Sequence, residues 1–195
     1  MVRDQYAQAI TFDSRFPPNR YLRWQDTQAH LLGRLLLLKG WESLGRDRAR
    51  IPALRYSDYH RPYFAEGPHF SIAHSGAYVL CAVSDQQPVG VDIERIRPIE
   101  LAEMEPSFSP SDWQAILAND NPRRYLFDYW TRKEAAIKAD GRGLLVVDRV
   151  ELQENQARIE DTVWHLLDLP IGPGHVAYLA TPEPSSAFRM IRIDY

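Results

Sequence analysis

Two acidic residues, Asp92 and Glu94, are the first candidates for chemistry. Residues 90–94 (GVDIE) alternate polar and apolar positions, so in a strand both carboxylates point to one face, about 6–7 Å apart. Such a pair repels unless water solvates it or a cation bridges it, and Mg²⁺ favours carboxylate, water and phosphate oxygens. Gly90 lies on the same face and leaves room for a bulky group. The alternative is a strand with one solvated face, which antiparallel sheets often have.

A second motif covers residues 130–144 (WTRKEAAIKADGRGL). In a helix Glu134 and Lys138 share a face, and a surface ion pair there contributes only about 0.3–0.5 kcal/mol. The chain has three lysines against 20 arginines, so a retained Lys138 favours a compact ammonium that reaches a phosphate. Gly141 and Gly143 allow a turn close to a ligand, but they complete neither a dinucleotide fingerprint nor a Walker loop.

A third motif, residues 70–76 (FSIAHSG), lies where a predicted strand ends. His74, Ser75 and nearby backbone amides could hold a phosphate there. The alternative for a lone histidine is a hydrogen-bonded structural role. A nucleophilic serine is less favoured, because neither Ser71 nor Ser75 lies in a Gly-x-Ser-x-Gly elbow.

Composition narrows the class of protein. The 195 residues are 45% hydrophobic and 25% charged, as in globular proteins, and the net charge of −3 argues against a generally basic nucleic-acid binder. The single cysteine, Cys81, excludes an intrachain disulfide and a thiolate zinc cluster, and it is interpreted as a buried small hydrophobe. The first residues lack the apolar core of a signal peptide, and Arg34 interrupts the longest apolar run. We therefore expect a soluble, cytoplasmic protein.

The spacing of apolar residues predicts an α+β fold with antiparallel sheets. A helix is expected from Asp26 or Thr27 to about Leu44, with Gly45 at its end, and two more begin at Ser109-Pro110 and Asn121-Pro122, the second ending at Gly141. Strands are expected at about 70–73, 78–83, 89–94, 146–152, 163–169, 175–181 and 188–193, with 78–83 apolar on both faces like a central strand. The elements divide into two closely packed halves, 1–88 and 89–195.

Taken in order, the three motifs resemble the 4′-phosphopantetheinyl transferase superfamily. Length and spacing are similar to its larger, single-chain (Sfp-like) branch rather than to the short trimeric synthases, and the resemblance covers about 61–144. It implies a pseudo-dimer of two α+β halves with the active site between them. It also implies an enzyme that moves the 4′-phosphopantetheine of coenzyme A to a serine of an acyl or peptidyl carrier protein and releases adenosine 3′,5′-bisphosphate.

The resemblance also implies roles for particular residues. Asp92, Glu94 and Glu134 would bind Mg²⁺ with the diphosphate, and Glu134 would also take the proton of the serine. Lys138 would contact the phosphates, while His74 and Arg61 would contact coenzyme A. Ala73 replaces a serine that many relatives carry, so Ser75 or a backbone amide would supply that phosphate contact. Lys133 and Trp130 are expected to be positional.

Two other functions remain open from the sequence: an inactive coenzyme A-binding module and a Mg²⁺-dependent hydrolase of coenzyme A or another diphosphate. Retention of all four of Asp92, Glu94, Glu134 and Lys138 argues against the first. The absence of a Nudix-type glutamate-rich helix pattern argues against the second. The expected partners are coenzyme A and a carrier protein, without nucleic acid or membrane, and the expected state is a monomer.

Overall fold

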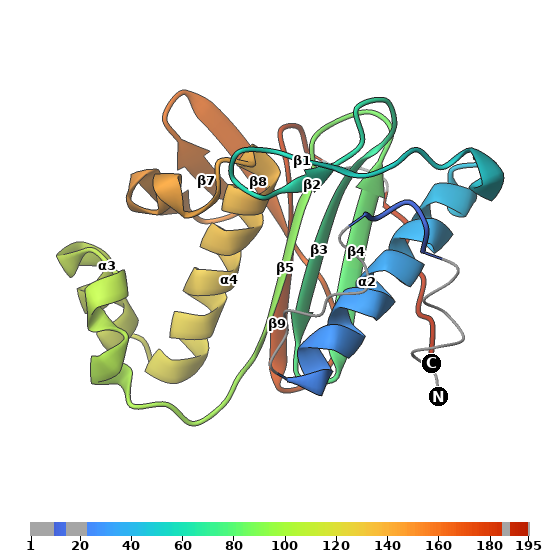
Figure 1. Ribbon diagram of the computed structural model, residues 1–195. Coiled ribbons are helices and arrows are strands. Elements are labelled where there is room, and N and C mark those ends of the chain that lie inside the picture. Colours follow the sequence, from blue (N-terminus) through green and yellow to red (C-terminus); the bar gives the residue numbers. More distant parts are fainter. Residues whose placement is uncertain (1–9, 15–22, 185–187, 195) are drawn as a thin grey trace.

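The protein folds into helices packed on antiparallel sheets, as seen in a computed structural model that describes residues 10–14, 23–184 and 188–194 (Figure 1). The helices are α2 (Trp24–Ser43), α3 (Pro110–Leu117) and α4 (Pro122–Asp140), with 3₁₀ segments η1 (Arg48–Arg50), η2 (Leu101–Glu103), η3 (Glu105–Ser107) and η4 (Gly143–Arg149). The strands are β1 (Arg55–Tyr56), β2 (Pro62–Tyr63), β3 (His69–Ser75), β4 (Tyr78–Ser84), β5 (Gly90–Arg95), β6 (Val150–Gln153), β7 (Gln156–Ile159), β8 (Thr162–Asp168) and β9 (His175–Thr181). The predicted α+β class is confirmed.

Helix α2 packs against the β3–β4 hairpin. It starts at Trp24, slightly before the predicted start, and it ends at Ser43, where Gly45 takes the left-handed φ of +75° that favours glycine. Its apolar side joins aromatic residues from the following segments in one core: Leu31, Leu35, Leu38, Trp41, Phe64 and Phe70. This core fixes the hairpin that carries the Ser/His motif.

Strand β4 is not the central strand that its apolar run predicts. Among the described residues it pairs with β3 alone, and each of its residues is only half-buried. Its two faces are both apolar because Cys81 and Val83 contact the α2 core, while Leu80 and Ala82 contact a second cluster around Val91. A strand covered on both faces by different layers has the composition of a central strand even at an edge.

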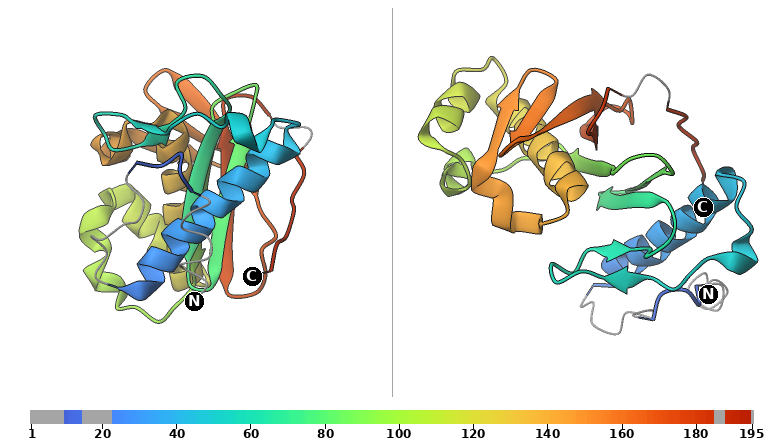
Figure 2. Two further views of the ribbon diagram at one scale, coloured as in Figure 1. Left: turned by 45° about the vertical axis from the view of Figure 1, so that its right-hand side comes forward. Right: turned by 90° about the horizontal axis from the view of Figure 1, so that it is seen from above.

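Strand β5 forms one edge of a five-stranded antiparallel sheet with the order β5-β9-β8-β7-β6. All six of its residues pair with β9, from Gly90 opposite Ala180 to Arg95 opposite His175. The other edge of β5 faces β3, so β3 to β5 lie between the group around α4 and the group around α2 (Figure 2).

The contact between β5 and β3 uses serine hydroxyls instead of a backbone ladder. Ser71 Oγ accepts a hydrogen bond from the Val91 N–H at 3.0 Å, and Ser75 Oγ accepts one from the Arg95 N–H at 2.9 Å. The sequence offset is 20 residues in both cases, so the two strands run parallel. We call this contact the serine seam.

Helix α4 lies on the face of β5 that carries Gly90 and Asp92. A Cβ atom at Gly90 would lie 2.0 Å from the Ala135 carbonyl oxygen and 2.4 Å from the Ala139 nitrogen, so only glycine allows this approach. The bulky group next to Gly90 is therefore the helix backbone and not a ligand. The alternative of a solvated strand face is wrong for Asp92, because the helix buries it, whereas Glu94 on the same face is half-buried.

The caps predicted for α3 and α4 are confirmed: Ser109 and Asn121 accept backbone N–H groups in the first turns, and Gly141 ends α4 with a φ of +90°. The C-terminal strands agree only in part. Residues 143–149 form η4 and only 150–153 form β6, while β7 was not predicted. Residues 188–193 alternate in polarity but form no strand, and they are exposed.

Candidate active site

The α4–β5 contact brings together four predicted site residues. Asp92 and Glu94 come from β5, and Glu134 and Lys138 come from consecutive turns of α4. Lys138 Nζ lies 2.5 Å from Asp92 Oδ1, so it pairs across to the strand instead of along the helix with Glu134. The surface ion pair considered for Glu134 and Lys138 is therefore not what forms.

Asp92 is a buried carboxylate with an incomplete set of partners. Its side chain is 7% exposed, and Oδ2 has no hydrogen-bond partner among the described residues. Burial raises the pKa of Asp92, while the charge and hydrogen bond of Lys138 act in the opposite direction. A buried carboxylate oxygen without a partner is costly, and a cation would satisfy it.

Glu94 is half-buried at the end of β5 and is held by β3. Ser75 Oγ donates a hydrogen bond to Glu94 Oε2 at 3.0 Å. Burial raises the pKa of Glu94, the Ser75 hydrogen bond lowers it, and the negative charge of Asp92 raises it further. Ser75 therefore contacts a predicted metal ligand, which differs from the phosphate contact expected from the sequence.

Glu134 completes the acidic group from the helix side. Burial raises its pKa, the negative charge of Asp92 raises it further, Lys138 lowers it, and Glu94 adds a smaller repulsion. The three carboxylates thus lie within electrostatic reach of one another with one ammonium to offset them. This arrangement is unfavourable for the protein alone and favourable for binding a cation.

The donor chemistry of this group fits Mg²⁺, which binds hard carboxylate oxygens and keeps sites for water and phosphate. As the side chains stand, no three His, Cys, Asp or Glu residues in the described ranges are gathered closely enough to hold a metal ion. Lys138 occupies Oδ1 of Asp92 and Ser75 occupies Oε2 of Glu94. The second oxygen of each carboxylate is therefore the one suited to a cation.

His74 lies beside this group on β3. Its side chain is exposed, and it is close enough to Asp92 for its charge to lower the pKa of that carboxyl. An exposed imidazole next to buried carboxylates can contact an anionic ligand that enters from solvent. The coenzyme A contact expected for His74 from the sequence stays a prediction.

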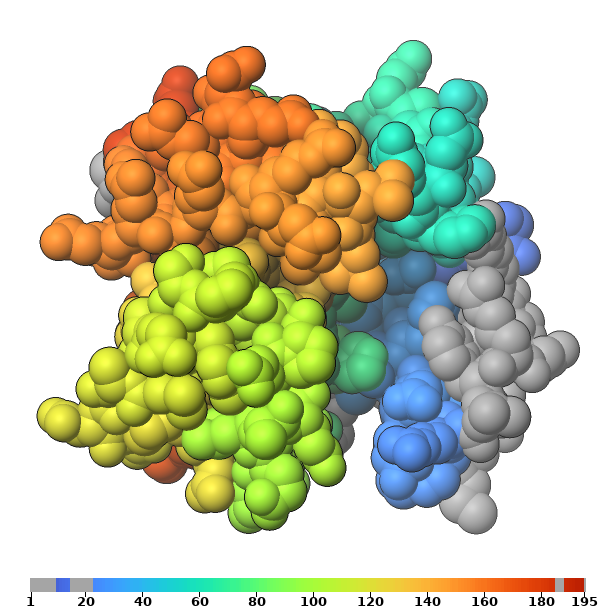
Figure 3. All heavy atoms as spheres, turned by 90° about the vertical axis from the view of Figure 1, so that its left-hand side faces the viewer, coloured from blue at the N-terminus to red at the C-terminus, as the bar shows by residue number. Residues whose placement is uncertain are grey.

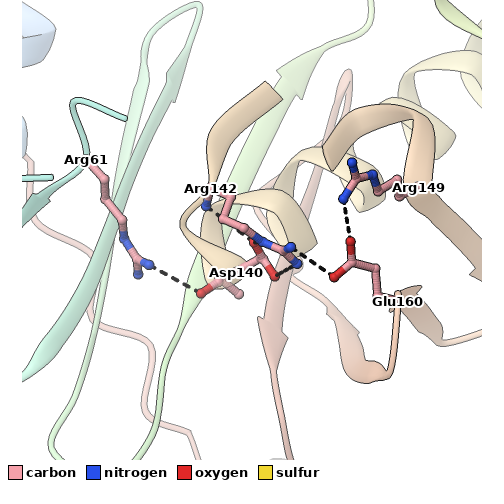
Figure 4. Close-up of polar contacts among 6 residues, drawn as sticks. Arg61, Asp140, Arg142, Arg149 and Glu160 are labelled. Atoms are coloured by element: carbon pink, nitrogen blue, oxygen red, sulfur yellow. Dashed lines mark hydrogen bonds and ion pairs between the residues drawn. The ribbon is translucent and has the colours of Figure 1, made fainter. Parts of the chain in front are cut away.

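Arg61 precedes β2 and reaches the C-terminal end of α4, where its Nη1 donates to the Ala139 carbonyl oxygen at 3.4 Å (Figure 4). Burial lowers the pKa of Arg61, and the charge of Asp140 acts in the opposite direction. Gly141 makes this approach possible, because its Cβ would lie 2.1 Å from Arg61 Nη1. No local sequence pattern predicts this contact, because Arg61 and Ala139 are 78 residues apart.

Asp140 belongs to a network of ion pairs that was not predicted from the sequence (Figure 4). Arg142 binds both of its oxygens, through Nε at 2.7 Å and Nη2 at 2.9 Å. Glu160 then accepts from Arg142 at 2.9 Å and from Arg149 at 2.5 Å. The network holds the turn after α4 against the β7–β8 turn, next to Arg61.

Lys133 and Trp130, expected to be positional, contact aromatic rings. The Lys133 ammonium lies 5.6 Å from the centroid of the Tyr129 ring, and burial lowers its pKa. Trp130 is half-buried, with its ring 6.2 Å from that of Phe108. The Trp130–Phe108 contact packs α4 against the segment that leads into α3, whereas the Lys133–Tyr129 contact lies within α4.

The molecular surface is hollowed between two groups of elements. In Figure 3 the hollow separates the lime-to-orange segment, which includes α3 and η4, from the blue-to-teal segment, which includes α2 and the β1–β2 hairpin. Green atoms of the β3–β4 region are visible at its floor.

Within the described part of the chain, no helix has the length and apolar character needed to cross a membrane.

Comparison with known proteins agrees with the motifs. The family model described as "4′-phosphopantetheinyl transferase superfamily" matches residues 88–179. The chain is 31% identical to the 4′-phosphopantetheinyl transferase Sfp of Bacillus subtilis (strain 168), over 98% of this chain and 91% of the relative. It is 30% identical to another 4′-phosphopantetheinyl transferase of Bacillus subtilis, over 87% of this chain and 75% of the relative. The chain therefore belongs to the 4′-phosphopantetheinyl transferase superfamily, on the branch of Sfp and its relatives.

Proposed function

We propose that this enzyme transfers 4′-phosphopantetheine from coenzyme A to a serine of an acyl or peptidyl carrier protein, with a Mg²⁺ ion held by Asp92, Glu94 and Glu134. The family membership supports the transfer reaction and coenzyme A as co-substrate. The observation that carries the metal assignment is Asp92, which is buried between β5 and α4 with Oδ2 unpartnered among the described residues.

The three carboxylates would hold Mg²⁺ together with the diphosphate oxygens of coenzyme A. When bound, Mg²⁺ would neutralise charge on the diphosphate and on the departing bisphosphate. Lys138 adds a fixed positive charge beside the same oxygens, because its ammonium already lies against Asp92. We propose that this charge holds the phosphates in place for transfer.

Glu134 is the proposed general base. It would take the proton from the serine hydroxyl of the carrier protein while the serine oxygen forms a bond to the β-phosphorus. The bond between that phosphorus and the oxygen bridging to the α-phosphate breaks, and adenosine 3′,5′-bisphosphate leaves with that oxygen. The position of Glu134 supports this role, because it lies on α4 one turn before Lys138 and within electrostatic reach of Asp92 and Glu94.

The nucleotide end of coenzyme A would contact His74 and Arg61. His74 is exposed beside the carboxylates, and Arg61 uses only one of its five N–H donors in the described contacts. Both residues can therefore donate to phosphate oxygens from the side of β3 and β2. The turn after α4, held by the Arg142 network, would form the opposite border.

We also propose that the chain acts as a monomer built of two halves, 1–88 and 89–195. The boundary falls in the turn between β4 and β5. The buried residues of the α2 core come from 10–70, and those of the α4 core from 135–180. All proposed ligands of the site come from one chain, so no second copy is needed to complete it.

Intact-mass spectrometry of an apo carrier protein tests the reaction. The carrier is incubated with the enzyme, coenzyme A and Mg²⁺, and a parallel sample contains EDTA. We expect a mass gain of one phosphopantetheine that EDTA abolishes. Coenzyme A binding without transfer to any of several carriers would instead indicate a binding module, and cleavage of free coenzyme A would indicate a hydrolase. A gain that persists in EDTA would contradict the metal assignment.

A further inference from the structure

The hydroxyl of Ser75 uses its only hydrogen within the protein. It donates its single hydrogen to Glu94 Oε2 at 3.0 Å and accepts the Arg95 N–H at 2.9 Å. A hydroxyl has one hydrogen to donate, and a phosphate oxygen needs a donor. Ser75 therefore cannot donate to a phosphate in this arrangement without releasing Glu94.

Ser71 makes the same contact to β5 without a carboxylate. Its Oγ accepts the Val91 N–H at 3.0 Å, four residues earlier on β3 and in the same register. Ser71 is buried, and it contributes to the serine seam in the same way as Ser75. What distinguishes Ser75 is its hydrogen bond to Glu94.

Glu94 needs such a restraint because its surroundings pull it in two directions. Negative charge on Asp92 repels it, whereas Lys138 in the site and Arg97, just after β5, both attract it. Without a fixed partner, the carboxylate could turn towards either of these cations. Hydrogen bonds to the ligands of a metal commonly prevent such rotation and fix which oxygen binds.

We propose that Ser75 is a positioning residue that holds Oε2 of Glu94 so that Oε1 is presented to the divalent cation. This inference rests on the proposed Mg²⁺ site. The serine contributes no ligand itself, and it acts on the cation through Glu94. Because its second hydrogen bond anchors it to Arg95 N–H, Glu94 is tied to the serine seam.

Mn²⁺ binding, measured by electron paramagnetic resonance at saturating coenzyme A, gives a readout that does not depend on turnover. We expect Ser75→Ala to weaken Mn²⁺ affinity about 10- to 100-fold. Ser75→Thr keeps a hydroxyl and should retain most of the affinity. Ser71→Ala removes the matching seam bond and should leave Mn²⁺ affinity unchanged, although its loss of thermal stability should resemble that of Ser75→Ala.

A double-mutant cycle isolates the route through Glu94. In a Glu94→Gln background, Ser75→Ala should weaken Mn²⁺ binding no further, because the oxygen it positions no longer carries a charge. Coenzyme A affinity in EDTA should stay within about threefold of wild type in Ser75→Ala. If Ser75→Ala does not fold, Ser75→Cys supplies a weaker donor and should give an intermediate Mn²⁺ affinity.

Three results would overturn the proposal: wild-type Mn²⁺ affinity in Ser75→Ala, an equal loss in Ser71→Ala, or a loss of coenzyme A affinity in EDTA that matches the loss of Mn²⁺ affinity. The last result would return Ser75 to a direct phosphate contact. Failure of the proposed function is distinct, because then the wild-type enzyme itself would neither bind Mn²⁺ nor modify a carrier protein.

Discussion

The two edges of β5 differ in how they are held. Towards β9, every residue of the strand joins an antiparallel backbone ladder, and α4 packs on the strand face at backbone contact through Gly90. Towards β3, the described contacts to β5 backbone N–H groups come from the hydroxyls of Ser71 and Ser75. Asp92 and Glu94, two of the proposed metal ligands, thus lie on a strand with one firmly held side and one lightly held side.

The residues of the candidate site are divided between these two sides of β5. Asp92, Glu134 and Lys138 all belong to the firmly held side, so their mutual geometry depends on the α4–β5 contact. His74 and Ser75 lie across the serine seam on β3. The hydroxyl contacts of the β3 side are weaker than a ladder, and apolar packing of Ala73 in one cluster with Val91 and Ile93 adds to them.

The largest expected effect comes from breaking the firm side with Gly90→Ala. The added methyl would overlap the Ala135 carbonyl oxygen, so α4 must move away from β5. We expect a loss of about 3 kcal/mol in the free energy of unfolding, measured in urea, and loss of carrier modification. Gly45→Ala is the control: it has a positive φ but open space, and should cost about 1 kcal/mol. Equal effects of the two substitutions would contradict the close packing.

Lys138→Arg tests the same side without breaking it. The guanidinium keeps the charge but is too broad and planar to replace an ammonium 2.5 Å from one buried oxygen. We expect kcat/KM for carrier modification to fall about tenfold or more, with little change in Tm. Lys39→Arg, in an exposed pair with Glu42, should have no effect. Full activity of Lys138→Arg would mean that the retained lysine has no special role.

The pH dependence of stability tests the burial of the three carboxylates at the α4–β5 contact. Burial raises the pKa of Asp92, Glu94 and Glu134, so above their ordinary values of 3.8 and 4.5 the folded protein holds protons that the unfolded chain releases. The free energy of unfolding of the metal-free protein should therefore fall as pH rises through that window. Glu134→Gln should flatten this dependence and raise Tm at neutral pH while abolishing turnover. The free energy of unfolding of this variant is measured by urea titration at several pH values. If it depends on pH as strongly as in the wild type, Glu134 does not contribute to the dependence.

Asp13, in the α2 core, should behave in the opposite way. Burial alone would raise its pKa, but hydrogen bonds from His30, Tyr56 and Arg34 bring it well below the ordinary 3.8. Its stabilising contribution is present above pH 3.8 and is lost as pH falls below that value. Urea titrations above this range therefore report mainly on the site carboxylates.

The smallest expected effect comes from strengthening the light side with Ala73→Ser. By strand alternation, residue 73 has the same orientation as Ser71 and Ser75, so a hydroxyl there would face the Ile93 N–H, which also interacts with the Asp92 carboxylate. We expect the free energy of unfolding to rise by about 0.5–1 kcal/mol, with an unchanged KM for coenzyme A. A lower KM without added stability would show that the hydroxyl contacts phosphate instead.

Features that depend on residues close together in the sequence could be predicted, and features that depend on distant residues could not. The starts of α3 and α4 were predicted because Ser109 and Asn121 cap their own first turns, only three residues away. The residues of the acidic group were found by motif, but burial of the Asp92 face was not, because it depends on Gly90 meeting Ala135 in another element. The Ser75–Glu94 contact likewise joins two strands, and no local pattern encodes it.

The C-terminal segment shows the converse. Alternation over 188–193 predicts a strand, yet the segment stays exposed and unpaired in the described structure. Periodicity describes which side chains could share a face, whereas a strand also needs a neighbouring edge. The prediction of a central strand at 78–83 was wrong for a related reason. Two different cores cover the faces of this strand, so it is apolar on both sides without a second neighbouring strand among the described residues.

Cys81 gives this protein a practical advantage for spectroscopy. It is the only cysteine in the chain, it is partly buried on β4, and burial raises the pKa of its thiol to about 12. At neutral pH it is almost entirely protonated and reacts slowly with maleimides. Cysteines introduced at exposed positions such as Tyr59 and Leu144 can therefore carry a pair of dyes without a background label. The distance between the dyes would then report in real time any movement of the β1–β2 hairpin relative to η4.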